Sequence, residues 1–245
     1  MSRVGNFSSS EIYRLMSYGR GAKTLDNTGK AFDSYVKEKA FERKIGRPLS
    51  LKTNARPTTW GTLVEEQCFN VLDLKYSLVS KTRYKHEELS EYWTGMPDLI
   101  TPELIGDIKC PYTMTGFMDL LDCMQSVEDL KRIKPQYYWQ LVSNGILCNR
   151  ENAVLVAYVP YFKDLEEIQE LARAKYQKAS NHEEIMYAKQ FSWVHFVEDL
   201  NELPHLPNNC DISDVNLFEF VIPQEDKELL TERVKMAVNK LKQLI

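Results

Sequence analysis

The strongest hydrophobic pattern in the chain is an apolar run at residues 152–158, Asn-Ala-Val-Leu-Val-Ala-Tyr. A short, uninterrupted run of this kind is typical of a central strand that is buried on both faces. Residues 104–109 indicate a second buried strand. Thr101-Pro102-Glu103 breaks the chain just before it, because proline fixes its own φ and cannot donate to a strand ladder. A shorter strand is expected upstream of this turn.

Apolar residues at helical spacing predict helices on both sides of these strands. The predicted helices cover residues 28–45, 61–71, 113–123, 129–148 with a break at Lys134-Pro135, 165–178 and 225–244. Ser8 and Glu11 have the spacing of a capping box, which predicts a further helix at the N-terminus. Weaker strands are expected at residues 76–79, 81–84, 191–197 and 215–222, and loops at 178–190 and 199–214. The order of elements predicts an α/β fold with a mixed central sheet flanked by helices, in a single domain spanning residues 1–245.

The composition is that of a globular protein, with 43% hydrophobic and 27% charged residues in a chain of 245. The sequence has no apolar run of membrane-spanning length and no secretory leader pattern, so we expect no membrane association and a cytoplasmic location. Five widely spaced cysteines without a Cys-x-x-Cys pair argue against zinc and iron–sulfur sites. Four scattered histidines likewise give no support to a histidine-based catalytic triad.

Charge is unevenly distributed, although the net charge is only −4. Residues 1–60 contain 12 basic and 5 acidic residues, whereas the rest of the chain is acidic. The predicted helix at 28–45 and the residues after it are especially basic, with Lys37, Lys39, Arg43, Lys44 and Arg47. These side chains could line a DNA channel, or they could form an ordinary solvated helix face.

The candidate chemistry lies on the strand at residues 104–109. Side chains alternate between faces along a strand, so Asp107 and Lys109 point to the same side. Asp98 lies on the strand before the turn. Two carboxylates can hold Mg²⁺ through their oxygens, and a neighbouring lysine can orient a water or offset charge on a phosphate. From Asp107 and Lys109 alone, a simple ion pair at a strand end near solvent is the favoured interpretation, because short motifs match by chance.

Three local motifs give this region a family resemblance. Pro97-Asp98 followed by Asp107-Ile108-Lys109 resembles the signature of PD-(D/E)xK nucleases. Lys109-Cys110-Pro111 resembles more narrowly the lambda-exonuclease (YqaJ-type viral recombinase) family, although Asp107 stands where lambda exonuclease has a glutamate. The resemblance covers roughly residues 3–160 and implies a restriction-endonuclease-like core. Residues 161–214 carry no motif that aligns with the family.

The same resemblance implies roles for further residues. Gly61-x-x-x-Glu65 and Tyr137-x-x-Gln140 match two other family motifs, so Glu65 and Gln140 are expected beside the catalytic residues Asp98, Asp107 and Lys109. The metal ligands would be Asp98, Asp107, the carbonyl of Ile108 and Glu65, holding Mg²⁺ with Mn²⁺ as a substitute. Arg3 and Ser10 stand where the family binds the 5′-phosphate of DNA.

By this resemblance the chain is expected to degrade one strand of linear duplex DNA in the 5′→3′ direction, releasing 5′-mononucleotides and leaving a 3′ single-stranded tail. The expected setting is phage-type recombination in a bacterial host, with double-stranded DNA ends as substrate, a single-strand-annealing protein as partner and a homotrimeric ring as assembly. Alternatives are another nuclease of the superfamily, either Cas4-like or a restriction or repair endonuclease, and an inactive DNA-end-binding protein.

Overall fold

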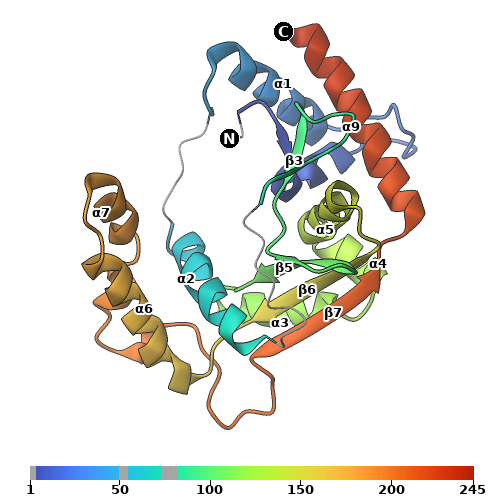
Figure 1. Cartoon of the computed structure of the whole chain (residues 1–245). Helices are drawn as coiled ribbons and strands as arrows, with labels where there is room; N and C mark the ends of the chain where they lie inside the picture. The colour runs from blue at the N-terminus through green and yellow to red at the C-terminus, as the bar shows by residue number, and fades with distance from the viewer. Residues whose placement is uncertain (1–3, 50–54, 73–81) are drawn as a thin grey trace.

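The computed structural model describes residues 4–49, 55–72 and 82–245 (Figure 1). Its central feature is a four-stranded sheet in the order β4-β5-β6-β7. The strands are β4 (Leu99–Ile100), β5 (Leu104–Lys109), β6 (Asn152–Tyr158) and β7 (Val215–Val221). The β5–β6 pair is parallel and the other two pairs are antiparallel, so the sheet is mixed as predicted. The turn at residues 101–103 closes with a hydrogen bond from Thr101 N to Leu104 O, 2.9 Å long.

Strand β6 divides the hydrophobic core into two layers because its side chains alternate between the faces of the sheet. Ala153, Leu155 and Ala157 pack in one cluster with apolar residues of the helices α3 (Met114–Cys123), α4 (Val127–Ile133), α5 (Pro135–Cys148) and α9 (Gln224–Leu244). Val154, Val156 and Tyr158 pack on the other face with α2 (Arg56–Val71), α6 (Leu165–Gln177) and α8 (Ser192–His195). Helices therefore cover both faces, which confirms the predicted α/β class.

A second, smaller sheet lies beside α5 and carries the N-terminus. Its order is β1-β3-β2, with β1 (Phe7–Ser8), β3 (Trp93–Gly95) and β2 (Tyr84–Lys85). The 3-10 helix η1 (Ser9–Met16) follows β1, and α1 (Lys30–Ile45) packs against η1 and α9. The strand predicted at 81–84 corresponds to the start of β2, whereas residues 76–79 lie outside the described residues. Figure 1 shows α1, α9 and β3 together at one end of the molecule.

The predicted capping box at the N-terminus is wrong. Ser8 makes no side-chain capping bond, and its Oγ lies 3.2 Å from Ser10 Oγ instead. Glu11 forms an ion pair with Arg14 at 3.6 Å. The segment is a 3-10 helix, which has i→i+3 hydrogen bonds and places residues at a different spacing from an α-helix.

Residues 161–214 form a helical arm, in which the helix predicted at 165–178 is confirmed as α6. The arm contains η3 (Phe162–Asp164), α6, α7 (His182–Lys189), α8 and η4 (Leu200–Glu202). The predicted strand at 191–197 is wrong: Phe191 and Val194 are both fully buried, and a spacing of three places them on one helical face. The predicted loop at 178–190 contains α7. Figure 1 shows α6 lying alongside α2, with α7 beyond it. Among the described residues, no helix is both long enough and apolar enough to cross a membrane.

Candidate active site

The β4–β5 hairpin holds Asp98 against the end of β5. Asp98 N donates to Gly106 O at 3.1 Å, and Asp98 Oδ2 accepts from Ile108 N at 2.9 Å. Just before the start of β4, the Asp98 side chain therefore takes the place of a strand partner for Ile108 of β5. The N–H and C=O of one strand residue point to the same side, so the carbonyl of Ile108 also faces Asp98. This arrangement brings together two of the predicted metal ligands, Asp98 and the carbonyl of Ile108.

Asp107 is buried, with 1% of its surface exposed, and has two polar partners. Gln140, from the middle of α5, donates through Nε2 to Asp107 Oδ1. Lys109 Nζ forms an ion pair with Asp107 Oδ2 and lies 3.4 Å from Gln140 Oε1. The Tyr137 ring lies beneath the same ammonium group, with its centroid 4.9 Å from Nζ. The structure thus unites Asp107, Lys109 and Gln140, as the motifs predicted.

The electrostatics of the site come from carboxylates that are close together in a dry environment. Burial raises the pKa of Asp98 well above its usual value, and the negative charges of Asp107 and Glu65 raise it further. Burial acts to lower the pKa of Lys109, but the carboxylates of Asp107 and Asp98 outweigh it and leave this pKa raised. Lys109 is therefore a protonated cation and donor at neutral pH, whereas Asp98 carries its charge at an energetic cost.

Glu65 faces this site from helix α2. Its charge contributes, after burial, to raising the pKa of Asp98, of Cys68 and of Cys110, so all three groups lie within its field. The neighbouring Glu66 is exposed and forms an ion pair with Lys175 of α6 at 2.5 Å. The predicted orientation, with Glu65 toward the site and Glu66 toward solvent, agrees with the structure.

The donor set suits a hard divalent cation. It consists of the carboxylates of Asp98 and Asp107, with the carbonyl of Ile108 on the same edge and the charge of Glu65 nearby. Mg²⁺ prefers oxygen donors. A bound cation would also offset the repulsion from Asp107 and Glu65 that, after burial, raises the pKa of Asp98. Within residues 4–49, 55–72 and 82–245, no group of three or more His, Cys, Asp or Glu side chains is arranged around one point. The carboxylates of Asp98, Asp107 and Glu65 are therefore not gathered into a preformed metal cage in this structure.

A pocket of about 150 Å³, here called the serine pocket, opens beside Asp98 and Gln140. Its other lining residues are Ser8, Ser9, Ser10, Arg83, Thr94, Gly95 and Met96. Ser10, which the family resemblance assigned to phosphate binding, thus lies in the same pocket as two catalytic candidates. Arg3 lies outside the described residues.

Two further side chains of the serine pocket escaped the sequence analysis. Thr94 is 1% exposed, and its Oγ1 has no hydrogen-bond partner in the described part of the chain. Arg83 supplies a half-buried cation. Neither residue stands in a motif, and they meet Ser10 through the pairing of β1 and β2 with β3. A hydroxyl and a guanidinium beside Ser10 are donors that suit an anion such as phosphate.

The basic helix α1, considered above as a possible wall of a DNA channel, uses some of its charges inside the protein and exposes others. Lys39 and Arg43 of the basic helix α1 are engaged inside the protein, Lys39 with Glu42 at 3.1 Å and Arg43 with Gly5 O at 2.8 Å. Lys37, Lys44 and Arg47 are exposed.

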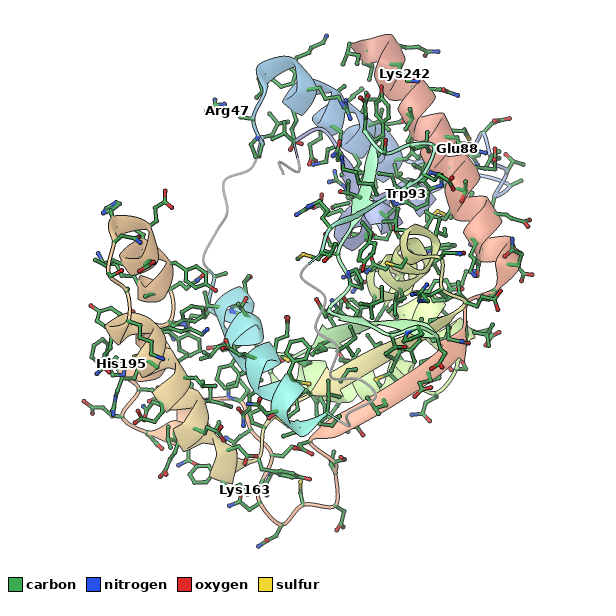
Figure 2. The ribbon with its side chains drawn as sticks, in the orientation of Figure 1. Arg47, Glu88, Trp93, Lys163, His195 and Lys242 are labelled. Carbon is green, nitrogen blue, oxygen red and sulfur yellow. The ribbon has the colours of Figure 1, made fainter. Side chains whose placement is uncertain are left out.

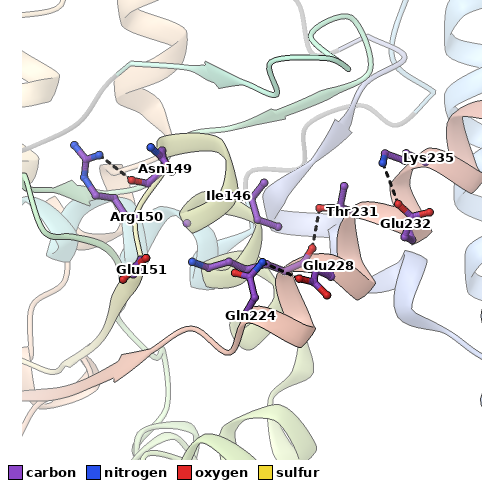
Figure 3. Close-up of a pocket in the computed structure, with 11 residues that line it drawn as sticks. Ile146, Asn149, Arg150, Glu151, Gln224, Glu228, Thr231, Glu232 and Lys235 are labelled. Carbon is purple, nitrogen blue, oxygen red and sulfur yellow. Dashed lines mark hydrogen bonds and ion pairs between the residues drawn. The ribbon is translucent and has the colours of Figure 1, made fainter.

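A larger pocket, of about 580 Å³, lies between the end of α5 and the start of α9 (Figure 3). Its charged side chains pair locally near solvent, as in Lys235–Glu232 at 2.9 Å, where the two side chains are 42% and 50% exposed.

No protein-family model matches the sequence, and no curated protein matches it. Solved structures do match. An alkaline exonuclease from Laribacter hongkongensis aligns over 98% of this chain and 90% of its own, with 11% identity and a TM-score of 0.61. Its complex with dAMP aligns over the same shares, with 12% identity and a TM-score of 0.60. A phage-related exonuclease from Haemophilus somnus 129PT aligns over 98% of this chain and 94% of its own, with 17% identity and a TM-score of 0.60. The chain therefore has the restriction-endonuclease-like fold of these exonucleases, as its resemblance to the lambda-exonuclease family predicted.

Proposed function

We propose that this protein is a Mg²⁺-dependent nuclease that degrades one strand of linear duplex DNA from its 5′ end. The observation that carries the proposal is the constellation at the end of β5. There Asp98 is bonded to Ile108 N, and Asp107 contacts both Lys109 and Gln140. The fold shared with two exonucleases supports the same reaction class.

The residues divide the chemistry between them. Asp98, Asp107 and the Ile108 carbonyl would hold the metal ion, and Glu65 would add a further negative charge beside it. When bound, Mg²⁺ polarises a phosphate oxygen and lowers the pKa of a coordinated water. Lys109, held in its protonated form by Asp107 and Asp98, orients the attacking water and offsets charge on the phosphate. Gln140 fixes Asp107 and accepts from Lys109, which keeps the ammonium group in place.

The proposed polarity rests on the serine pocket. A DNA end with a 5′-phosphate would place that phosphate against Ser10, Thr94 and Arg83, at the N-terminal end of η1. Arg3 joins this set by family resemblance. The pocket has room for little more than one sugar–phosphate unit, and Asp98 and Gln140 lie in its wall. The phosphate that follows the terminal nucleotide would then meet the catalytic carboxylates.

The proposal also includes the assembly and partner implied by the family resemblance, a ring of three subunits and a single-strand-annealing protein. A ring that encircles its substrate prevents dissociation between successive cleavages, and closed symmetry leaves no open interface. Light scattering at micromolar concentration tests the assembly. A mass of about three times 28.6 kDa supports the ring, and a stable monomer contradicts it.

The reaction itself is tested by a time course on linear duplex DNA labelled separately at its 5′ and 3′ ends, with Mg²⁺ or with EDTA. Release of labelled 5′-mononucleotide from the 5′ end, with the 3′ label retained on long strands, is the expected result. EDTA should stop the reaction. Internal cuts would instead indicate an endonuclease, and binding without cleavage would indicate an inactive end-binding protein.

A further inference from the structure

A second cavity, of about 360 Å³, adjoins Lys109 at the end of β5, and we call it the tyrosine cavity. It is lined by residues at or near the starts of three helices, α2, α3 and α5, and by the chain that leaves β5. The side chains that matter for its chemistry are Pro57, Lys109, Tyr112, Thr113, Lys134 and Tyr137. The proposed reaction gives this cavity no function.

The tyrosine cavity and the serine pocket meet at the catalytic residues. Gln140 lines the serine pocket and Lys109 lines the tyrosine cavity, and the Lys109 Nζ to Gln140 Oε1 distance is 3.4 Å. A strand that occupies both cavities would therefore cross the contact between Lys109 and Gln140, and both of these side chains also contact Asp107. The two cavities are thus placed to hold the units on the two sides of one phosphodiester bond.

The walls of the tyrosine cavity have the chemistry of a nucleotide site. Tyr112 and Tyr137 offer aromatic rings, on which a base of any identity can stack. Lys109 and Lys134 offer ammonium groups for a backbone phosphate. No ion pair is formed by Lys134 with any side chain in the described ranges, so its charge is available to a ligand. The volume lies within the range of small-ligand sites.

The helical arm fixes one wall of this cavity. Trp193 of α8 donates from Nε1 to Thr59 Oγ1 at 3.0 Å, one turn from the start of α2. The Tyr112 ring packs edge-on against the Trp193 ring, with centroids 5.9 Å apart. The Arg56 guanidinium lies 5.3 Å from the same indole. The arm thereby sets the position of Tyr112 and Pro57 relative to Lys109.

We propose that the tyrosine cavity binds the nucleotide on the 3′ side of the scissile phosphate, in the strand being degraded. Tyr112 contacts its base and Lys134 contacts the phosphate beyond it. This assignment rests on the proposed function, because it takes the serine pocket as the site of the 5′-terminal unit. With this site occupied, the enzyme stays bound to the strand after the terminal nucleotide has been released.

Short ligands test the assignment separately from the reaction. The ligands are the 5′-phosphorylated mononucleotide and dinucleotide of thymidine, and a 5′-phosphorylated trinucleotide that carries the phosphate beyond the second unit. Their affinities are measured by calorimetry for the Asp98→Asn protein, which cannot turn them over. Lys134→Met removes the charge and keeps the alkyl chain, and Tyr112→Leu removes the ring and keeps bulk against Trp193. Tyr137 is left unchanged because it supports Lys109.

The dinucleotide should bind about tenfold more tightly than the mononucleotide, and Tyr112→Leu should abolish this gain. Lys134→Met should abolish the further gain of the trinucleotide. The matched control is Lys163→Met, since Lys163 (labelled in Figure 2) also lies over a tyrosine ring, Tyr161 at 5.3 Å, but lines neither the tyrosine cavity nor the serine pocket. The assignment is wrong if the affinity still increases from mononucleotide to dinucleotide in Tyr112→Leu and from dinucleotide to trinucleotide in Lys134→Met. A wild-type protein that cleaves no DNA removes the proposed function and this assignment together.

Discussion

Ser9 and Ser143, which are 134 positions apart in the sequence, share a buried hydrogen bond of 2.8 Å between their Oγ atoms. Ser143 also accepts from Trp93 Nε1 at 2.8 Å, and it lies one turn after Gln140 on α5. The Ser143 hydroxyl therefore links the serine pocket to α5, the helix that carries Gln140. The positions of the terminal phosphate and of the catalytic amide are thus coupled.

Ser143→Ala should destabilise the protein by about 1–3 kcal/mol, because two buried polar groups lose their partner. The preference for 5′-phosphate over 5′-hydroxyl ends should fall at the same time, since the serine segment loses its attachment to α5. Thermal unfolding and initial rates on the two substrates measure both effects. Ser213→Ala, at an exposed position, is the control. An unchanged melting temperature would show that the hydroxyl bridge does not support the fold.

Gly95→Ala should be strongly destabilising. A Cβ at this position would lie 2.2 Å from Ser9 Oγ and 2.3 Å from Asn144 Oδ1, so η1 and α5 would have to separate. Overpacking of this kind costs typically about 1–3 kcal/mol. Gly61→Ala is the matched control, because the nearest atom to its Cβ would be 3.9 Å away in the interior of α2. That variant should be stabilised by roughly 0.5–1 kcal/mol, and comparison of denaturant midpoints tests both.

Asp98→Asn should be more stable than wild type at high pH in EDTA. Burial, and then the charges of Asp107 and Glu65, raise the pKa of Asp98 in the folded state above the value of about 3.9 in an unfolded chain. The charged form therefore penalises folding, and this penalty is absent below about pH 4 and grows as pH rises toward the folded pKa. The melting temperatures of the two proteins should agree near pH 4 and diverge by pH 8. At pH 8, Mg²⁺ should raise the melting temperature of the wild type but not that of Asp98→Asn. A difference in melting temperature between the two proteins that does not change with pH would contradict the electrostatic explanation.

Trp193→Ala should lower catalysis through the helical arm, although Trp193 is not in the active site. The substitution removes the hydrogen bond to Thr59 and the ring contact with Tyr112, so α2 and its Glu65 lose their anchor. We expect a lower kcat at saturating DNA together with a higher KM. Phe196→Ala, in the same arm but 64% exposed, should change neither constant. Wild-type kinetics in Trp193→Ala would mean that the arm does not support the site.

The sequence predicted the strands β5 and β6 from local pattern, and family motifs predicted that Asp98, Asp107, Lys109 and Gln140 lie together. Alternation along a strand puts Asp107 and Lys109 on one face whatever surrounds them. The spacing of Tyr137 and Gln140 places both on one side of α5, and the family motif predicted that Gln140 lies beside the catalytic residues. Local periodicity and a family motif point to the same residues here, so the site core was predictable.

The remaining features depend on contacts that no local pattern encodes. The arm is an example, since residues 191–197 alternate like a strand, yet burial of Phe191 and Val194 against α6 and α2 selects a helical turn. Thr94 and Arg83 reach the serine pocket through the pairing of β1, β3 and β2, whose register cannot be inferred from strands of two or three residues. The hydroxyl bridge between Ser9 and Ser143 belongs to the same class of long-range contact.

The central claim is that the groups at the end of β5 cleave DNA, and Lys109→Ala tests it most directly. The measurement is the single-turnover rate of 5′-mononucleotide release from 5′-phosphorylated linear duplex with Mg²⁺, at enzyme concentrations that saturate binding. Lys163→Ala serves as the control, and circular dichroism verifies the fold of each variant. The account predicts a rate lower by at least about a hundredfold for Lys109→Ala, because the ammonium group acts on charge that develops in the transition state. A rate equal to that of wild type, in a correctly folded Lys109→Ala protein, would contradict it.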